Sequence, residues 1–274
     1  MAIFKPGWLS KNYEKAYKAV NKLSEQNKLL QAAMYSHHSG IRLMAVEKIT
    51  DEKILGELAK DKLNDTDYTA QHFMFTEANA ENNIVTGIIN ANAQINDDID
   101  VRNKAFEMLS DKKILVDVAK NAKAPYIRKS ACEKLTDEVV LTGIAMNDAS
   151  DFVYETAIIM VNDQSMLAKI AVNASIAGAR LKAASKLADQ QLVNEVLVDI
   201  AKNAERFYSC AAIKKLKDKQ NALIDIIKNA ADSYVRIQAL WELNDIEILT
   251  DIAQNDDDDG VRSNAVARIE QIRG

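Results

Sequence analysis

The side chains most capable of chemistry in this chain are charged residues that recur at a fixed spacing. An arginine recurs in most copies of one motif, and an aspartate follows nine positions later. The arginines are Arg42, Arg102, Arg128, Arg180, Arg236 and Arg262, and the aspartates are Asp51, Asp111, Asp137, Asp163, Asp189 and Asp245. A row of guanidinium groups could bind anions. Because aspartate recurs as faithfully as arginine, we expect instead a structural ladder in which each arginine pairs with a nearby turn carboxylate, weakest where Tyr154 and Tyr208-Ser209 interrupt the arginines.

Other reactive residue types are sparse or poorly arranged. The adjacent His37 and His38 do not share a helix face and lack a partner three or four positions away, and His72 stands alone, so we expect no metal site. The acidic run 255–260 resembles the start of a calcium loop, but Val266 occupies the position of the bidentate glutamate. Nucleophile-elbow, phosphate-loop, dinucleotide and zinc-protease motifs do not occur. We therefore expect a protein that is not an enzyme and needs no cofactor.

These charged residues belong to a 26-residue repeat of the form (V/I)-R-x-x-A-x-x-x-L-x-D. Copies begin at Val101, Ile127, Val153, Ala179, Val235 and Val261. With the first residue of each copy numbered 0, apolar residues at 0, +4 and +8 form one stripe of a helix. The aspartate at +10 is a natural N-cap for a second helix, whose apolar stripe follows at +14, +17 and +18. Asparagine at +20, as in Asn121, reads as a C-cap in the left-handed conformation, so each unit is predicted to be one short helical hairpin.

The repeats are expected to cover nearly the whole chain as a single domain, 1–274. Residues 1–14 are predicted to be an N-terminal cap, 15–260 the repeats, and 261–274 a half repeat. The longer spacing from Ile41 to Val101 predicts an irregular unit near residues 67–92, and the spacing from Ala179 to Val235 predicts an extra helical turn at 192–198. A fixed period of this length is typical of a solenoid, so we expect about nine helical-hairpin repeats.

Composition agrees with an all-α fold and argues against two classes of partner. Two prolines and eight glycines in 274 residues leave little material for hairpin turns. A net charge of −5 disfavours nucleic acid, which needs a concentrated basic face. Apolar stretches are too short to span a bilayer, and the N-terminus does not resemble a signal peptide. We expect a cytoplasmic protein in which Cys132 is a buried hydrophobe.

The V-R-x-x-A-x-x-x-L motifs resemble those of HEAT-like and armadillo-like bacterial repeat proteins. That resemblance implies a right-handed α-solenoid, an alpha-alpha superhelix, in which the helix carrying V-R-x-x-A lines the concave side. Positions +2 and +6 of that helix point away from the core stripe. Most units carry polar residues there, but five are apolar: Leu43, Ile159, Leu181, Ile237 and Trp241. Exposed apolar side chains on such a face are what a peptide-binding groove needs, unless repeat twist buries them.

The sequence favours a non-catalytic protein-interaction or scaffold module, a monomer that binds a protein or peptide on its concave face. The principal alternative is a HEAT-like DNA-binding protein of the DNA glycosylase type, for which Trp8, Trp241 and Tyr154 could supply aromatic side chains. A third possibility is a HEAT-like lyase that attaches bilin chromophores, although the sequence contains nothing specific to that chemistry.

Overall fold

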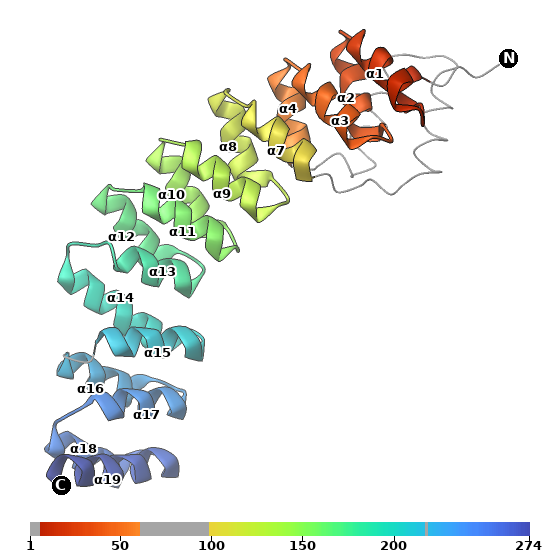
Figure 1. Ribbon diagram of the computed structural model, residues 1–274. Helices are drawn as coiled ribbons and strands as arrows, with labels where there is room; N and C mark the ends of the chain where they lie inside the picture. Colours follow the sequence, from red (N-terminus) through yellow and green to blue (C-terminus); the bar gives the residue numbers. More distant parts are fainter. Residues whose placement is uncertain (1–5, 61–98, 217–218) are drawn as a thin grey trace. The chain divides into compact units, whose positions relative to one another are not determined.

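The computed structural model describes residues 6–60, 99–216 and 219–274. These residues form seventeen α-helices and one 3-10 helix, and the described part contains no β-strand (Figure 1). The all-α expectation is confirmed. The contacts divide the chain into two compact units, Met1–Leu135 and Thr136–Gly274, and each is described by itself.

The helices are short and alternate with turns of two to five residues over most of the described ranges. In the first unit they are η1 (Gly7–Leu9), α1 (Tyr13–Asn21), α2 (Gln26–Tyr35), α3 (Ser39–Glu47), α4 (Glu52–Lys60), α7 (Ile99–Glu107), α8 (Lys112–Asn121) and α9 (Pro125–Lys134). In the second unit they are α10 (Glu138–Asn147), α11 (Asp151–Met160), α12 (Gln164–Asn173), α13 (Ala177–Ala184), α14 (Gln190–Asn203), α15 (Arg206–Lys215), α16 (Gln220–Asn229), α17 (Ser233–Glu242), α18 (Ile246–Asn255) and α19 (Asp259–Arg273).

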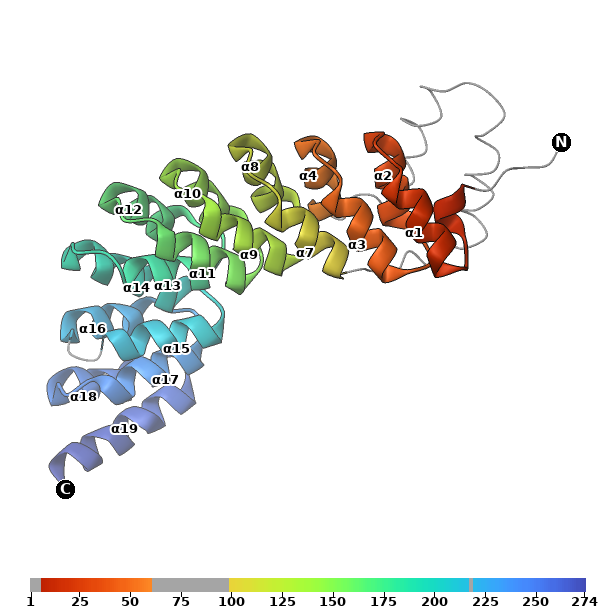
Figure 2. The same ribbon diagram turned by 45° about the horizontal axis from the view of Figure 1, so that its top comes forward.

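The helices pack in two rows within each unit. We call the helices that carry position 0 the first helices (α1, α3, α7, α9, α11, α13, α15, α17 and α19) and the others the second helices. First helices one repeat apart contact each other, as α11 does with α13 and α15 with α17 (Figure 2). Second helices do the same, as α10 does with α12. This repeated stacking of helix pairs is the construction of an α-solenoid.

The tightest pairs combine helices of neighbouring units rather than the two helices of one predicted hairpin. Each second helix packs most closely on the first helix that follows it, as α10 does on α11 and α12 on α13. The period is therefore as predicted, while the hairpin is shifted by one helix. The periodicity of the sequence could not show which of the two neighbours along the chain a helix packs on most closely.

The core is formed by the apolar stripes that the repeat predicts. Position +4 is alanine in nearly every unit, and Ala105, Ala131 and Ala157 are fully buried. Cys132 is also fully buried, as expected. A small side chain there lets adjacent helices approach closely. The extra turn predicted between Ala179 and Val235 is present, because α14 is 14 residues long where its neighbours have 10.

The aspartates at +10 are N-caps of the second helices, as predicted. Asp111 Oδ1 accepts hydrogen bonds from the backbone N–H groups of Lys113 (2.8 Å) and Ile114 (3.1 Å). The same arrangement is found at Asp51, Asp137, Asp163, Asp189 and Asp245. The predicted left-handed asparagine C-caps are wrong: Asn121 is the last helical residue, the next residue is extended with φ −63°, and the Asn121 amide donates back to Asp117.

The arginines at +1 bind mainly backbone carbonyls at the end of the preceding second helix. Nη1 of Arg128 donates to Ala122 O (2.8 Å) and Nη1 of Arg236 to Ala230 O (3.0 Å). Arg42 donates to Ser36 O in the same way. Cationic donors satisfy the carbonyls that a helix C-terminus leaves without intrahelical partners.

The ion pairs seen for these arginines do not use the predicted aspartates at +10, although Asp256, the partner of Arg236, is a turn carboxylate. Arg180, Arg236 and Arg262 pair with Asp199, Asp256 and Asp259, rather than with an aspartate at +10. Positions +1 and +10 lie at opposite ends of the first helix, about 14 Å apart at 1.5 Å per residue, so a side chain cannot bridge them.

Two further side-chain series, which the sequence analysis missed, join consecutive repeats. A lysine or arginine at +7 donates to carbonyls at the end of the preceding first helix, as Lys48 does to Val20 O (2.9 Å) and Asn21 O (2.6 Å). Lys134, Lys186 and Arg268 do the same. A glutamine or glutamate at +11 accepts from backbone N–H groups one repeat later, as Gln164 does from Ala188 N (2.9 Å). Gln26, Glu52 and Glu138 repeat that bond, and so does Gln220, which lies one position later in its unit.

The helices on either side of residues 61–98 are direct neighbours in the stack. Helix α3 packs on α7 and α4 packs on both α7 and α8. Glu52 of α4 accepts hydrogen bonds from Ser110, which is the +11 bond spanning 58 positions instead of about 24. No repeat of the described chain separates α3 from α7. The irregular unit expected at 67–92 lies outside the described residues, and eight full repeats and a half are present without it.

The two ends of the described chain depart from the repeat. Trp8 of η1 is buried, and its carbonyl accepts a hydrogen bond from Ser36 Oγ at the end of α2 (3.0 Å). At the other end, α19 is a lone first helix of 15 residues that packs on α17 and α18. Helices η1 and α19 thus flank the described repeats, while the single domain 1–274 and its boundaries at 14 and 261 stay predictions.

The +7 cations are expected to contribute measurably to stability. Lys48→Met keeps the aliphatic stem but removes two charge-assisted hydrogen bonds, so it should lower the free energy of unfolding by about 1–3 kcal/mol. Lys53→Met, at an exposed position of α4, should change it by less than about 0.5 kcal/mol. Urea unfolding of both variants measures the difference, and equal effects would remove the proposed role of Lys48.

Candidate interaction surface

One side of the first helices in the second unit carries large side chains that the core does not use. We call this side the first-helix face and define it by positions −1, +2, +3 and +6, which fall on one stripe of a helix. Its members are Phe152, Glu155, Thr156 and Ile159 on α11; Gly178, Leu181, Lys182 and Ser185 on α13; Phe207, Cys210, Ala211 and Lys214 on α15; and Tyr234, Ile237, Gln238 and Trp241 on α17. Phe207 is 76% exposed, Phe152 69% and Ile159 56%. Side chains of this kind seldom stay so exposed without a partner when they gather on one face.

The structure brings four of the five predicted partner-binding residues to this face. Ile159 is exposed, whereas Leu181, Ile237 and Trp241 are half-buried. The Trp241 indole N–H donates to Asn264 Oδ1 of α19 (3.1 Å), so this residue also holds the last repeat in place. Leu43 is half-buried on α3 and belongs to the other unit. Packing between neighbouring repeats therefore accounts for part of the apolar character at +2 and +6.

The most exposed residues of the face were missed in the sequence because they precede the repeat motif. Position −1 holds Phe152, Phe207 and Tyr234 in the second unit, and Tyr126 in the first. The signal was available: an aromatic residue recurs directly before position 0. Gly178 stands at the same position between Phe152 and Phe207.

Charges on this face are largely paired with each other. Lys182 Nζ lies 3.0 Å from Glu155 Oε2, which joins α13 to α11. Arg206 Nε lies 2.6 Å from Asp232 Oδ2, and its guanidinium sits 5.2 Å from the centre of the Tyr234 ring. With these charges paired, the exposed apolar rings are the most prominent feature of the face.

The two interruptions of the arginine series meet at one place. Tyr154 of α11 and Tyr208 of α15 are hydrogen-bonded through their side chains, and both hydroxyls lie where a Cβ of Gly178 would be. Burial, the Tyr208 hydroxyl and the nearby Glu155 and Asp151 carboxylates raise the pKa of Tyr154 to about 12. In the α15 unit, Ser209 Oγ replaces the arginine by donating to Ala204 O (3.1 Å).

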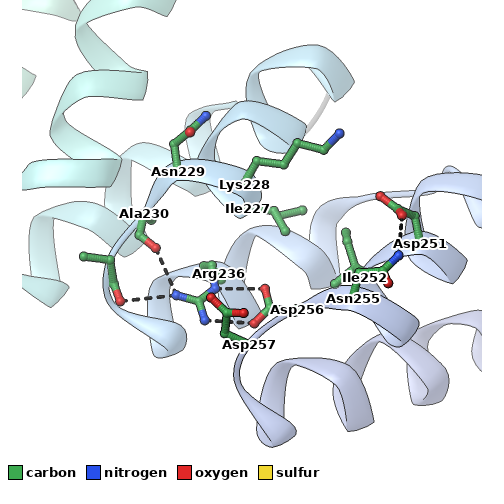
Figure 3. Close-up of a pocket in the computed structure, with 11 residues that line it drawn as sticks. Ile227, Lys228, Asn229, Ala230, Arg236, Asp251, Ile252, Asn255, Asp256 and Asp257 are labelled. Carbon is green, nitrogen blue, oxygen red and sulfur yellow. Dashed lines mark hydrogen bonds and ion pairs between the residues drawn. The ribbon is translucent and has the colours of Figure 1, made fainter.

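A pocket of about 450 Å³ lies among residues 227–257 of the second unit. It lies between the ends of α16 and α18, and several of its polar groups bind one another (Figure 3). Arg236 contacts both carboxylate oxygens of Asp256 at 2.9 and 3.0 Å, and the Asn255 amide donates to Asp251 Oδ1 (2.8 Å). This pocket is a depression between two repeats in which Arg236 and Asp256 already satisfy each other's charge.

Comparison with known proteins leaves the function to be argued from the structure. No family model matches the chain, and no curated protein matches it. Within the described ranges, His, Cys, Asp and Glu side chains do not gather in threes as metal ligands would. None of the described helices combines the length and the apolar character needed to cross a bilayer.

We expect stability to require glycine at position 178, because the tyrosine hydroxyls occupy the space of a Cβ. A Cβ added at Gly143 of α10 would meet nothing within 4 Å. Gly178→Ala forces the tyrosine hydroxyls to move, so it should lower the free energy of unfolding by about 1–3 kcal/mol. Gly143→Ala should raise it by up to about 1 kcal/mol through helix propensity. Adding Tyr154→Phe to Gly178→Ala should recover part of the loss in chemical denaturation, and a purely additive double variant would contradict the contact.

The raised pKa of Tyr154 predicts a loss of stability at alkaline pH. The neutral hydroxyl is favoured in the folded state, so its contribution is complete below pH 10.0, the ordinary tyrosine value, and is lost as the pH rises toward about 12. The free energy of unfolding should therefore fall more steeply over this interval in the wild type than in Tyr154→Phe. Urea titrations at pH 9 and 11.5 test this, and parallel declines would show that Tyr154 is not responsible.

Proposed function

We propose that this chain is a non-catalytic binding module whose protein partner docks on the first-helix face of residues 136–274. The observation that carries the proposal is the set of exposed apolar side chains at Phe152, Ile159 and Phe207. Burying each against a partner would stabilise a complex by about 1.5–3 kcal/mol, and aromatic anchors commonly dominate binding energy.

On α7 and α9 of the first unit, positions +2, +3 and +6 are polar instead of apolar. Helix α7 carries Asn103 and Lys104 there, and α9 carries Lys129 and Glu133. Lys104 pairs with Glu47 (3.3 Å) and Lys129 with Glu133 (2.9 Å), so these positions form a solvated, ion-paired surface. The same repeat scaffold thus presents different surfaces, and the apolar one favours a protein partner.

Nucleic acid is less well suited to the first-helix face. Phosphate binding requires available cations, and two cations here, Lys182 and Arg206, are already paired with Glu155 and Asp232.

The test is a matched pair of double variants. Ile159→Asp/Phe207→Asp places two charges on the first-helix face, and Val139→Asp/Val172→Asp places them on exposed sites of the second helices α10 and α12. All four side chains are at least 47% exposed, so both variants should fold, as circular dichroism would verify.

In pull-downs read by quantitative mass spectrometry, we expect partners of the wild type to be reduced at least tenfold by the first variant and retained by the second. Equal retention by both variants would refute the first-helix face as the binding surface. Equal loss would assign binding to the second helices or to a general effect of acidic charge.

A further inference from the structure

We propose that the Tyr154–Tyr208 pair and the flanking Phe152 and Phe207 form an anchor subsite for a cationic side chain, a lysine or arginine of a bound peptide. The inference rests on the proposed function and specifies what the partner must present. It concerns one place on the first-helix face, between α11 and α15 over the glycine of α13.

The repeat makes this place unlike the rest of the face. Phe152, Gly178 and Phe207 occupy position −1 of three successive first helices, and α13 contacts both α11 and α15. The central helix has no side chain at this position, and the two phenolic hydroxyls lie over its Cα instead. Two phenolic hydroxyls therefore lie at Gly178, on the helix between those that carry the largely exposed Phe152 and Phe207.

The rings and hydroxyls together favour a cation over an apolar group. Aromatic faces attract ammonium and guanidinium groups, and phenolic oxygens accept hydrogen bonds from them. Phe207 packs edge-to-face on Tyr208 with ring centroids 5.2 Å apart, and this contact orients the Phe207 and Tyr208 rings relative to each other. An apolar side chain would cover the two hydroxyl oxygens without adding a donor to the one hydrogen bond that they share, which is costly.

The surrounding charge complements a basic partner. Asp151 is the first residue of α11, and Glu205 is the N-cap residue of α15. The nearby cations are engaged elsewhere: Arg206 binds Asp232 and the Tyr234 ring, while Lys182 binds Glu155. The carboxylates around the two phenylalanines therefore create a negative potential at the subsite.

The probe is a displayed library of random 12-residue peptides, selected on the full chain. Peptides enriched on the wild type but not on Ile159→Asp/Phe207→Asp should share a lysine or arginine beside apolar residues. An enriched peptide, synthesised with a fluorescein label, is then titrated by fluorescence anisotropy.

A double-mutant cycle assigns the cation to the subsite. Replacing the basic residue of the peptide by methionine should weaken binding to the wild type about tenfold. The same replacement should have less than a twofold effect on Phe152→Ala/Phe207→Ala, because the rings that receive the cation are gone. Val139→Ala/Val172→Ala serves as the matched control and should behave as the wild type does.

Two results would overturn the inference while leaving the proposed function intact: face-dependent peptides without basic residues, or a tenfold effect of the methionine replacement that persists in Phe152→Ala/Phe207→Ala. Failure to enrich any face-dependent peptide also overturns it. The proposed function fails on the pull-downs alone, if Ile159→Asp/Phe207→Asp retains every partner or if both double variants lose them equally.

Discussion

The constraint on which this structure depends is the need to satisfy backbone polar groups at the ends of many short helices. A helix of about ten residues leaves nearly as many N–H and C=O groups without intrahelical partners as it satisfies. Side chains at repeated positions bind these groups: aspartate at +10 caps its own second helix, arginine at +1 binds carbonyls of the helix before, and lysine at +7 and glutamine at +11 reach the adjacent repeat. Because the last two bonds cross between repeats, they also fix the register of the stack.

Because these side chains bind helix ends, the helices can stack regularly even where the number of residues between repeats changes. Glu52 binds Ser110 with the same bond that Gln164 makes to Ala188, although the first pair spans more than twice as many positions in sequence. The longer α14 is tolerated similarly, since its Asp189 cap and its packing on α15 are both kept. In a repeat array each unit contacts mainly its neighbours, so an irregularity in the connection changes little as long as those contacts remain.

The first-helix face is formed by repeat positions at which the residue type can vary. Positions 0, +4 and +8 are committed to the core, and +1, +7, +10 and +11 to helix ends, which leaves −1, +2, +3 and +6 to vary. In the second unit this freedom is used for exposed phenylalanines, and Tyr154 and Ser209 replace the arginine at position +1. Such departures from an otherwise strict pattern are where function is most often found.

The sequence by itself determined the helix content, the 26-residue period, the buried alanines and the aspartate caps, because each depends on residues close together in the chain. It also marked the breaks at Tyr154 and Tyr208, though not that they meet. Only the tertiary structure decided which helices pair most closely, that α3 lies directly on α7, and that the arginines bind carbonyls and carboxylates other than the aspartates at +10. The same holds for the half-buried Trp241 and the exposed Phe207. These features depend on contacts that range from six positions apart, as between Arg128 and Ala122, to 58, as between Glu52 and Ser110. A periodic sequence offers several equivalent partners for such contacts, and only packing in three dimensions chooses among them.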